Sequence, residues 1–181
     1  MRSQTKQNRV RNTAVSALCA LLLAACGDSP ESMLASAKEY MAKNDRNAAS
    51  IQLKNALQKN PTFAEARFLL GKVNFDQGDY AGAEKELSRA LDMGFSPDQV
   101  VPLLAQAMLA SGQGQRIITE LGSKELSQPD AKASLMTSKG FALLQQGKRI
   151  PAQEEFTAAI KASPGFPLAR VGLARMRALE R

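Results

Sequence analysis

The clearest pattern of apolar and small residues along the chain begins at Phe68. Phe68-Leu69-Leu70-Gly71 is followed by the turn sequence Gly78-Asp79-Tyr80 and then by Ala83, Leu87 and Ala90. The last three residues are spaced by four and three positions, so they lie on one face of a helix. The pattern therefore predicts two helices joined by a tight turn.

The same pattern recurs about every 34 residues, and a period of that length is typical of stacked helix-turn-helix repeats. The chain is rich in Ala, Leu, Gln, Lys and Glu and almost lacks runs of β-branched residues, so we expect an all-α protein. The predicted repeats span residues 30–63, 64–97, 98–131 and, after one inserted residue, 133–166. Residues 167–181 then form either a capping helix or the beginning of a fifth repeat.

The second helix of the repeat at 98–131 departs from the pattern. Ile117 occupies the position of a small residue, Lys124 lies where Ala is expected, and Gly122-Ser123 interrupts the segment. Gly inside a helix costs about 1 kcal/mol relative to Ala. We therefore expect this helix to be short.

Residue size follows the period as well. Small residues at six repeat positions are expected to let the two helices of a repeat approach closely: Gly71, Ala83, Ala90, Gly140, Ala152 and Ala159. Larger residues are expected to fill the space between neighbouring repeats, at Tyr40, Leu70, Leu87 and Phe156. One repeat cannot bury its apolar face alone, so the stack supplies the core.

On these residues the chain resembles the tetratricopeptide repeat (TPR), a helix-turn-helix unit of 34 residues whose helices are named A and B. Leu70-Gly71 matches the Leu-Gly pair of helix A, and Ala83 and Ala90 match the small residues of helix B. The resemblance implies a curved solenoid of about four repeats whose A helices line a concave, protein-binding groove. The family's two-carboxylate clamp is incomplete here, so we do not expect recognition of chaperone C-termini.

Carrying the groove over by repeat position gives a set that is apolar apart from Gln106, Thr137 and two Lys. The expected groove residues are Leu34, Lys38, Met41, Phe68, Lys72, Phe75, Gln106, Leu109, Thr137, Phe141 and Leu144. Such a set suits an extended or helical peptide of some acidic character. The alternative for each apolar residue is that it packs against a neighbouring helix.

The N-terminal residues have the pattern of a secretory signal. A basic segment without acidic residues precedes an apolar stretch at about 14–25, which is too short to span a membrane as a helix. Leu23-Ala24-Ala25-Cys26 resembles a bacterial lipobox, which implies removal of residues 1–25 and lipidation of Cys26. Residues 26–29 would then form a short tether to a TPR domain at 30–181. Gly27, in place of Asp, implies the periplasmic face of the outer membrane rather than the inner membrane.

Composition excludes several functions. The chain has no His, and its second Cys, Cys19, lies inside the predicted signal, so the mature part has no disulfide, Cys nucleophile or Cys/His zinc site. Four basic residues are also removed with the signal, which lowers the net charge from +7 to +3. We therefore expect no cofactor, no nucleic-acid binding and no enzyme, although carboxylates that converge in the fold could still catalyse.

Three segments narrow the resemblance: residues 51–58, 64–71 and 78–94 are similar to the TPR lipoproteins of the PEP-CTERM/exosortase system, the PrsT type. This similarity implies a scaffold in exopolysaccharide production and PEP-CTERM protein sorting, with no catalytic role. Members of that family are longer, so the chain is expected to be a truncated gene, a fragment or a short relative. The alternative is a pilotin-like or outer-membrane assembly-factor lipoprotein.

Overall fold

The computed structural model describes residues 29–178, and within this range the regular secondary structure is entirely helical. The signal peptide and the lipidation of Cys26 predicted from the sequence lie outside the described residues and stay predictions. The helices are α2 (Pro30–Ala42), α3 (Arg46–Lys59), α4 (Ala64–Asp76), α5 (Tyr80–Asp92), α6 (Pro97–Ala110), α7 (Gly114–Arg116), the π-helical turn η1 (Ile117–Leu121), α8 (Pro129–Gln145), α9 (Arg149–Ala162) and α10 (Pro167–Ala178).

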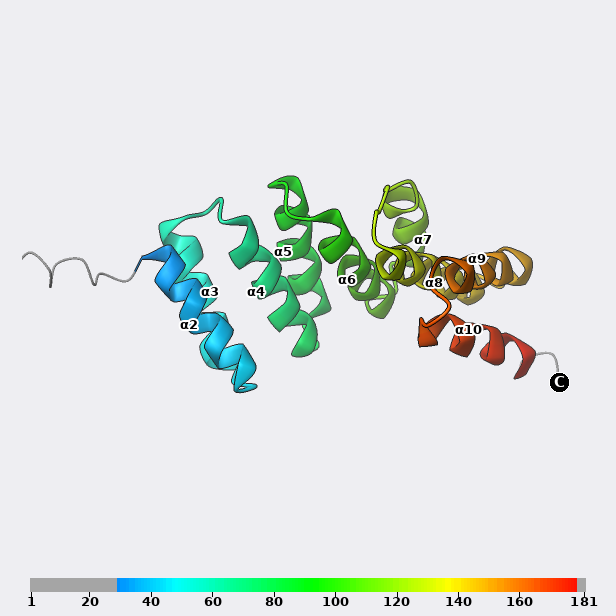
Figure 1. The fold of residues 1–181 in the computed structure, drawn as a ribbon, viewed down its shortest axis with the longest axis horizontal. Coiled ribbons are helices and arrows are strands. Elements are labelled where there is room, and N and C mark those ends of the chain that lie inside the picture. The colour runs from blue at the N-terminus through cyan, green and yellow to red at the C-terminus, as the bar shows by residue number, and fades with distance from the viewer. Residues whose placement is uncertain (1–28, 179–181) are drawn as a thin grey trace, which may run out of the picture.

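These helices form antiparallel hairpins that stack side by side into an elongated array (Figure 1). The pairs are α2 with α3, α4 with α5, α6 with α7 and η1, and α8 with α9, while α10 packs on both α8 and α9. Contacts run from each hairpin to the next along the array rather than converging on one centre. The all-α solenoid expected from the sequence is confirmed.

The turn inside each hairpin depends on one residue with positive φ. Asn44, Gly78, Gly112 and Gly147 have φ of 59°, 81°, 75° and 74°. All four lie at the same repeat position, just before the second helix of the hairpin. Left-handed backbone is strained for most residues with a side chain and is tolerated best by Gly and Asn, which are the residues found at this position.

The two helices of a hairpin meet where a residue without a side chain contacts a large one. A Cβ added at Gly71 of α4 would lie 2.7 Å from Cγ of Leu87 on α5. At the equivalent place in the fourth hairpin, a Cβ on Gly140 would lie 2.6 Å from the ring of Phe156, and one on Gly172 of α10 would overlap the same ring. The expected role of the small residues at Gly71 and Gly140 is confirmed.

The second helix of the third hairpin is short, as the sequence predicted. It consists of the three residues of α7 and the turn η1, and it ends before Gly122. The chain then crosses to α8, which begins at Pro129, four residues before the expected repeat start at 133. The carboxylate of Asp98 on α6 holds this crossing, because its Oδ1 accepts hydrogen bonds from the backbone N–H of Ser127 at 2.8 Å and of Gln128 at 3.0 Å.

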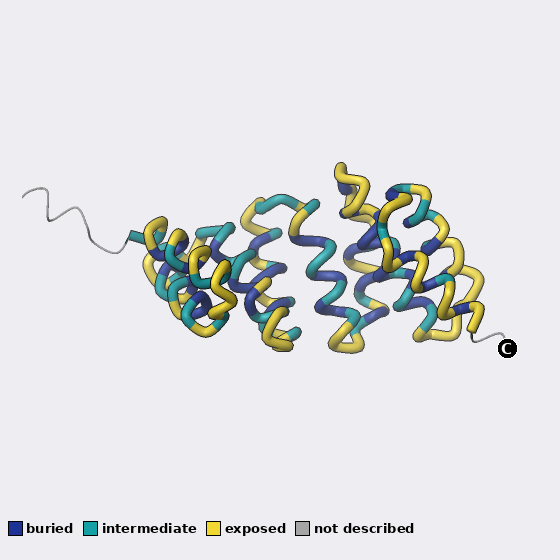
Figure 2. The backbone as a smooth tube through the Cα atoms, turned by 60° about the horizontal axis from the view of Figure 1, so that its bottom comes forward, coloured by how far each residue is buried: buried dark blue, intermediate teal, exposed yellow. Residues whose placement is uncertain are grey.

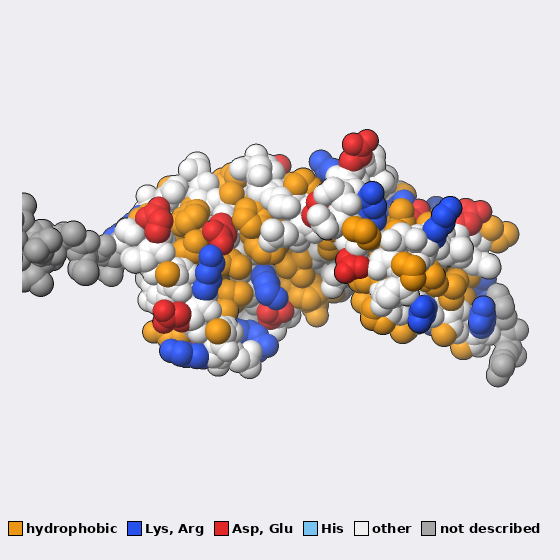
Figure 3. Space-filling view, in the orientation of Figure 1, with side chains coloured by type: hydrophobic (Ala, Val, Ile, Leu, Met, Phe, Trp, Pro, Cys, Tyr) orange, Lys and Arg blue, Asp and Glu red, His pale blue; other side chains and the backbone are white. Residues whose placement is uncertain are grey.

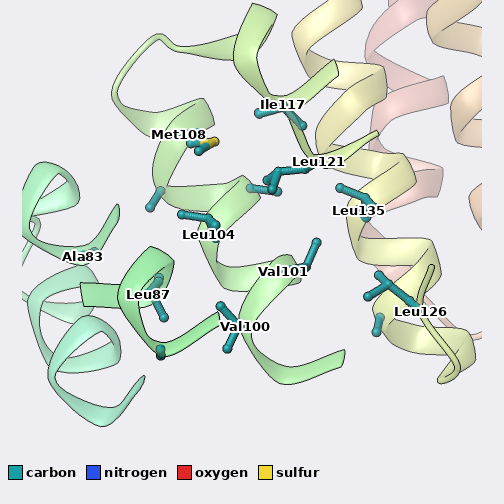
Figure 4. Close-up of a cluster of buried hydrophobic side chains, with 14 of the residues drawn as sticks. Ala83, Leu87, Val100, Val101, Leu104, Met108, Ile117, Leu121, Leu126 and Leu135 are labelled. Carbon is teal, nitrogen blue, oxygen red and sulfur yellow. The ribbon is translucent and has the colours of Figure 1, made fainter. Parts of the chain in front are cut away.

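The core runs along the array as a row of clusters between the hairpins (Figure 2). The central cluster joins the second, third and fourth hairpins, with Leu87 on one side, Leu104 and Leu121 at its middle and Leu135 on the other side (Figure 4). Ile117 is fully buried, although it occupies a position that the repeat gives to a small residue.

The last helix, α10, repeats the arrangement of α4. Nη2 of Arg67 on α4 donates to the carbonyl of Pro61 at 2.8 Å, and Nη2 of Arg170 on α10 donates to the carbonyl of Pro164 at 2.7 Å. Each Arg lies at the fourth position of its unit and each Pro ends the preceding one. Within residues 167–178, α10 thus repeats the capping contact of α4, and both interpretations of residues 167–181, a capping helix and the beginning of a fifth repeat, stay predictions.

Gly140→Ala should lower the free energy of unfolding by about 1–2 kcal/mol, measured by urea denaturation. Overpacking typically costs about 1–3 kcal/mol, which exceeds what Ala gains in helix propensity. The Phe156 ring cannot retreat, because Gly172 contacts it as well. Gly165→Ala is the matched control: Gly165 has open space and no positive φ, so Ala should be neutral or stabilise by about 0.4–1 kcal/mol. Equal effects of the two variants would contradict the packing argument.

Gly78→Ala should destabilise the protein by about 1 kcal/mol, because left-handed backbone costs an L-residue roughly 1–2 kcal/mol. A side chain at this position meets no neighbouring atom, so the backbone conformation alone accounts for the loss. Gly78→Asn should cost less, since Asn44 adopts the same conformation in the first hairpin. Thermal unfolding of the two variants checks this order, and a smaller loss for Ala than for Asn would refute it.

Candidate protein-binding groove

The predicted groove residues come from the first helix of each hairpin, at the fifth, ninth and twelfth positions of the repeat. Those helices, α2, α4, α6 and α8, follow one another along the array (Figure 1). Direct contacts join α4 to α6 and α6 to α8, and an ion pair joins α2 to α4. The side chains at these positions therefore come from consecutive helices of one array.

Two residues of the predicted set are inside the protein. Leu34 is 6% exposed and packs in the first core cluster with Leu53 and Leu70. Thr137 is 3% exposed, and its hydroxyl donates to the carbonyl of Ala133 at 2.7 Å. For Leu34 the alternative of packing against neighbouring helices describes the structure, whereas Thr137 is buried with its hydroxyl bonded inside its own helix α8.

The two lysines of the set reach solvent, and each lies beside an acidic residue. Nζ of Lys38 is 2.6 Å from a carboxylate oxygen of Glu65, and Nζ of Lys72 is 3.7 Å from one of Asp76. Exposed pairs of this kind contribute about 0–1 kcal/mol to stability. Their consequence for binding is larger, because an acidic partner has to compete with Glu65 and Asp76 for both lysines.

Aromatic side chains form the middle of the groove. Phe68 stacks on Phe95 with ring centroids 4.8 Å apart, and Phe75 meets Tyr80 edge to face at 5.5 Å. Phe68, Phe75 and Met41 are all half-buried, so part of each side chain remains at the surface. Figure 3 shows hydrophobic side chains exposed between charged ones on the face in view. Rings held by neighbouring rings give a partner an apolar surface that is already ordered.

The C-terminal end of the set surrounds a hollow. Gln106 donates from Nε2 to the hydroxyl of Ser134 at 3.3 Å, which ties α6 to α8 beside it. The hollow has a volume of about 380 Å³ and is lined by Leu109, Phe141, Leu144, Gln145 and Arg175. Three predicted residues from two neighbouring repeats, Leu109 from one and Phe141 and Leu144 from the next, are thus brought together in one pocket.

Sequence reasoning missed the two residues that α10 adds to this surface. Val171 and Arg175 occupy the fifth and ninth positions of their unit, where Thr137 and Phe141 lie in the preceding one. Val171 is 53% exposed, and Arg175 lines the pocket. The sequence does indicate these two positions, because Val171 and Arg175 follow Thr137 and Phe141 by one repeat length. The repeat pattern alone does not assign them to the groove, because residues 167–181 could also form a capping helix.

The pKa shifts of the described residues have structural causes outside the groove. Hydrogen bonds to Glu120 and then to Glu84 raise the pKa of Arg116, and the bond from Arg116 lowers that of Glu120. The hydrogen bond from the Ser127 hydroxyl lowers the pKa of Asp98. Residues 29–178 contain no cluster of three or more His, Cys, Asp or Glu suited to a metal ion. No helix in this range is long and apolar enough to cross a membrane.

Residues 34–99 match a family model described as the tetratricopeptide repeat. A comparison with curated proteins gives no match. Among solved structures, a TPR protein from Parabacteroides merdae is similar, with a TM-score of 0.69 and 20% identity. The likeness covers 84% of this chain but only 61% of the length of the Parabacteroides protein.

Two further solved structures are similar. YrrB, described as a TPR protein with an unusual peptide-binding site, has a TM-score of 0.70 and 18% identity, covering 89% of this chain and 82% of its own. MamA has a TM-score of 0.64 and 23% identity, covering 88% of this chain and 87% of its own. At these identities the likeness concerns the fold alone. The described residues therefore form a TPR solenoid, and residues 34–99 also match the tetratricopeptide repeat in sequence.

Proposed function

We propose that the protein is a lipid-anchored scaffold that binds a segment of another protein along its A helices. The observation that carries this proposal is the row of partly exposed side chains at equivalent repeat positions of successive helices. Met41, Phe68, Phe75, Leu109 and Phe141 all belong to this row, and each is half-buried. A solenoid needs only the faces between hairpins for its own stability, so an ordered apolar row on a free face supports binding.

The chemistry of this surface suits recognition. Its described side chains are apolar, amide or basic, and both lysines of the original set pair with neighbouring acids. A partner would bury apolar side chains against the rings of α4 and in the hollow between α6, α8 and α10, and its backbone could be extended or helical. We propose no catalytic role for this surface.

The cellular part of the proposal rests on the sequence. The lipobox at 23–26 supports a lipid anchor at Cys26, and Gly27 supports the periplasmic face of the outer membrane. The similarity of residues 51–58, 64–71 and 78–94 to PEP-CTERM/exosortase TPR lipoproteins supports a place in exopolysaccharide production and protein sorting. The pilotin-like and assembly-factor alternative predicts a different partner, so identifying the partner separates the two.

Cys26→Ser should abolish incorporation of radioactive palmitate in bacterial cells, because the Cys26 thiol is the proposed attachment point of the lipid. Cys19→Ser is the matched control and should label normally, since Cys19 lies in the segment that is removed. The measurement is labelling of the immunoprecipitated protein together with the mass of its N-terminal peptide. Labelling of Cys26→Ser at the wild-type level would refute the anchor.

A photo-crosslinking aromatic residue at Phe75 should capture the partner in cells. Phe75 is half-buried beside Tyr80, so an aromatic replacement keeps the local packing. The same residue at Lys85, which is exposed on helix α5, is the control and should capture no specific partner. Mass spectrometry of the adduct identifies the captured protein.

The identity of the adduct separates the interpretations. An exosortase or polysaccharide-export component supports the full proposal. Capture of a secretin or barrel protein would support the scaffold function and the assembly-factor alternative, and it would contradict the role in exopolysaccharide production and protein sorting. Adducts that form from Lys85 and not from Phe75 would place binding on the other face and refute the groove.

A further inference from the structure

The groove ends in a pocket that differs from the rest of the surface. Leu109 of α6 and Phe141 and Leu144 of α8 form its apolar part, while Gln145 and Arg175 contribute polar groups. Its volume of about 380 Å³ is near the lower end of the range for ligand pockets, roughly 300–1,000 Å³. That size fits one or two side chains of a longer partner.

Arg175 distinguishes the pocket electrostatically. Among the described residues it has no carboxylate within ion-pair distance, whereas Lys38 and Lys72 each have one. None of the five described residues that line the pocket is acidic. Within residues 29–178, the groove therefore has paired cations on α2 and α4 and, on α10, a guanidinium that pairs with no carboxylate of that range.

We infer that this pocket anchors a partner segment in which a bulky apolar side chain lies beside a carboxylate. The inference rests on the proposed scaffold function and specifies what the scaffold selects. The apolar side chain contacts Leu109, Phe141 and Leu144, and the carboxylate accepts hydrogen bonds from the guanidinium of Arg175. Arg suits this role because its planar group can bind a carboxylate through two parallel hydrogen bonds.

Exposed apolar surface on α10 continues the site beyond the pocket. Val171 lies one helical turn before Arg175, on the same face of the helix, and is 53% exposed. A partner that places its carboxylate at Arg175 can therefore cover Val171 as well. This continuity favours a polypeptide segment over an isolated small molecule.

Methyl NMR of the full-length protein tests the inference with two dipeptides, acetyl-Phe-Glu-amide and acetyl-Phe-Gln-amide. Both should shift the methyl resonances of Leu109 and Leu144, because both carry the apolar side chain. The Glu dipeptide should bind about fivefold more tightly, the ratio expected for a partly exposed ion pair. Arg175→Gln should remove this preference without removing binding of the Gln dipeptide. Arg177→Gln, on the same helix but outside the pocket, should preserve it.

Several outcomes would overturn the inference. Equal affinity for the two dipeptides in the wild type, or a preference that survives Arg175→Gln, excludes Arg175 as the carboxylate site. Unchanged Leu109 and Leu144 resonances exclude the pocket. Shifts of these two resonances on dilution of the protein alone would show that a second copy occupies it.

The result is independent of the crosslinking experiment at Phe75. If a partner is captured from Phe75 but the Glu dipeptide is not preferred at Arg175, the scaffold function is supported and only the proposed selectivity of the pocket is refuted. A carboxylate preference at Arg175 without any partner at Phe75 would confine binding to the C-terminal end. The failures of the two proposals are therefore distinguishable.

Discussion

The close approach of two helices at a residue with little or no side chain is the contact on which the whole array depends. Gly71 against Leu87 and Gly140 against Phe156 show it at equivalent positions of the second and fourth hairpins. In the first and third hairpins the same two positions are occupied by Ala37 with Leu53 and by Ala105 with Leu121, all of them buried. Each hairpin thus pairs a small residue on its first helix with a large residue on its second. The ring of Phe156 contacts Gly172 of the following unit in the same way. Because the contact recurs at a fixed period, the hairpins stack with a regular orientation and their first helices follow one another.

This manner of stacking leaves the groove face of the first helices free. The regular pattern is interrupted in the third hairpin. Its second helix ends early. The segment that leads from it to α8 is bound to α6, because the carboxylate of Asp98 accepts hydrogen bonds from the backbone N–H groups of Ser127 and Gln128. The first helices α6 and α8 nevertheless remain in contact, joined also by the bond between Gln106 and Ser134. The irregularity is therefore confined to the second-helix side, and the groove side continues from α2 to α10.

The groove is asymmetric in charge along its length. Toward its beginning, Glu65 and Asp76 lie beside the two lysines, so under the proposed function a partner would be held there mainly by aromatic and apolar groups. At its end, the apolar pocket and Arg175 combine hydrophobic contact with one cation that has no partner among the described residues. A charge at one end only would fix the direction in which a bound segment lies, because reversal of the segment would move its carboxylate away from Arg175. Such an arrangement agrees with the proposed scaffold function.

The sequence by itself determined the period, the hairpins and the weak point in the third unit. These features depend on local properties: helix spacing, the tolerance of positive φ by Gly and Asn, and the effect of Gly122-Ser123 on a helix. The sequence also contains Leu23-Ala24-Ala25-Cys26, whose resemblance to a lipobox stays a prediction because it lies outside the described residues. Tertiary structure alone decided which groove positions reach solvent, since Leu34 and Thr137 have the same repeat position as the exposed Val171 but are buried. It also decided that Lys38 pairs with Glu65 on the next hairpin and that α10 brings Arg175 to Leu109. Periodicity fixes the face on which a side chain lies, whereas exposure and pairing depend on how closely helices distant in sequence approach one another.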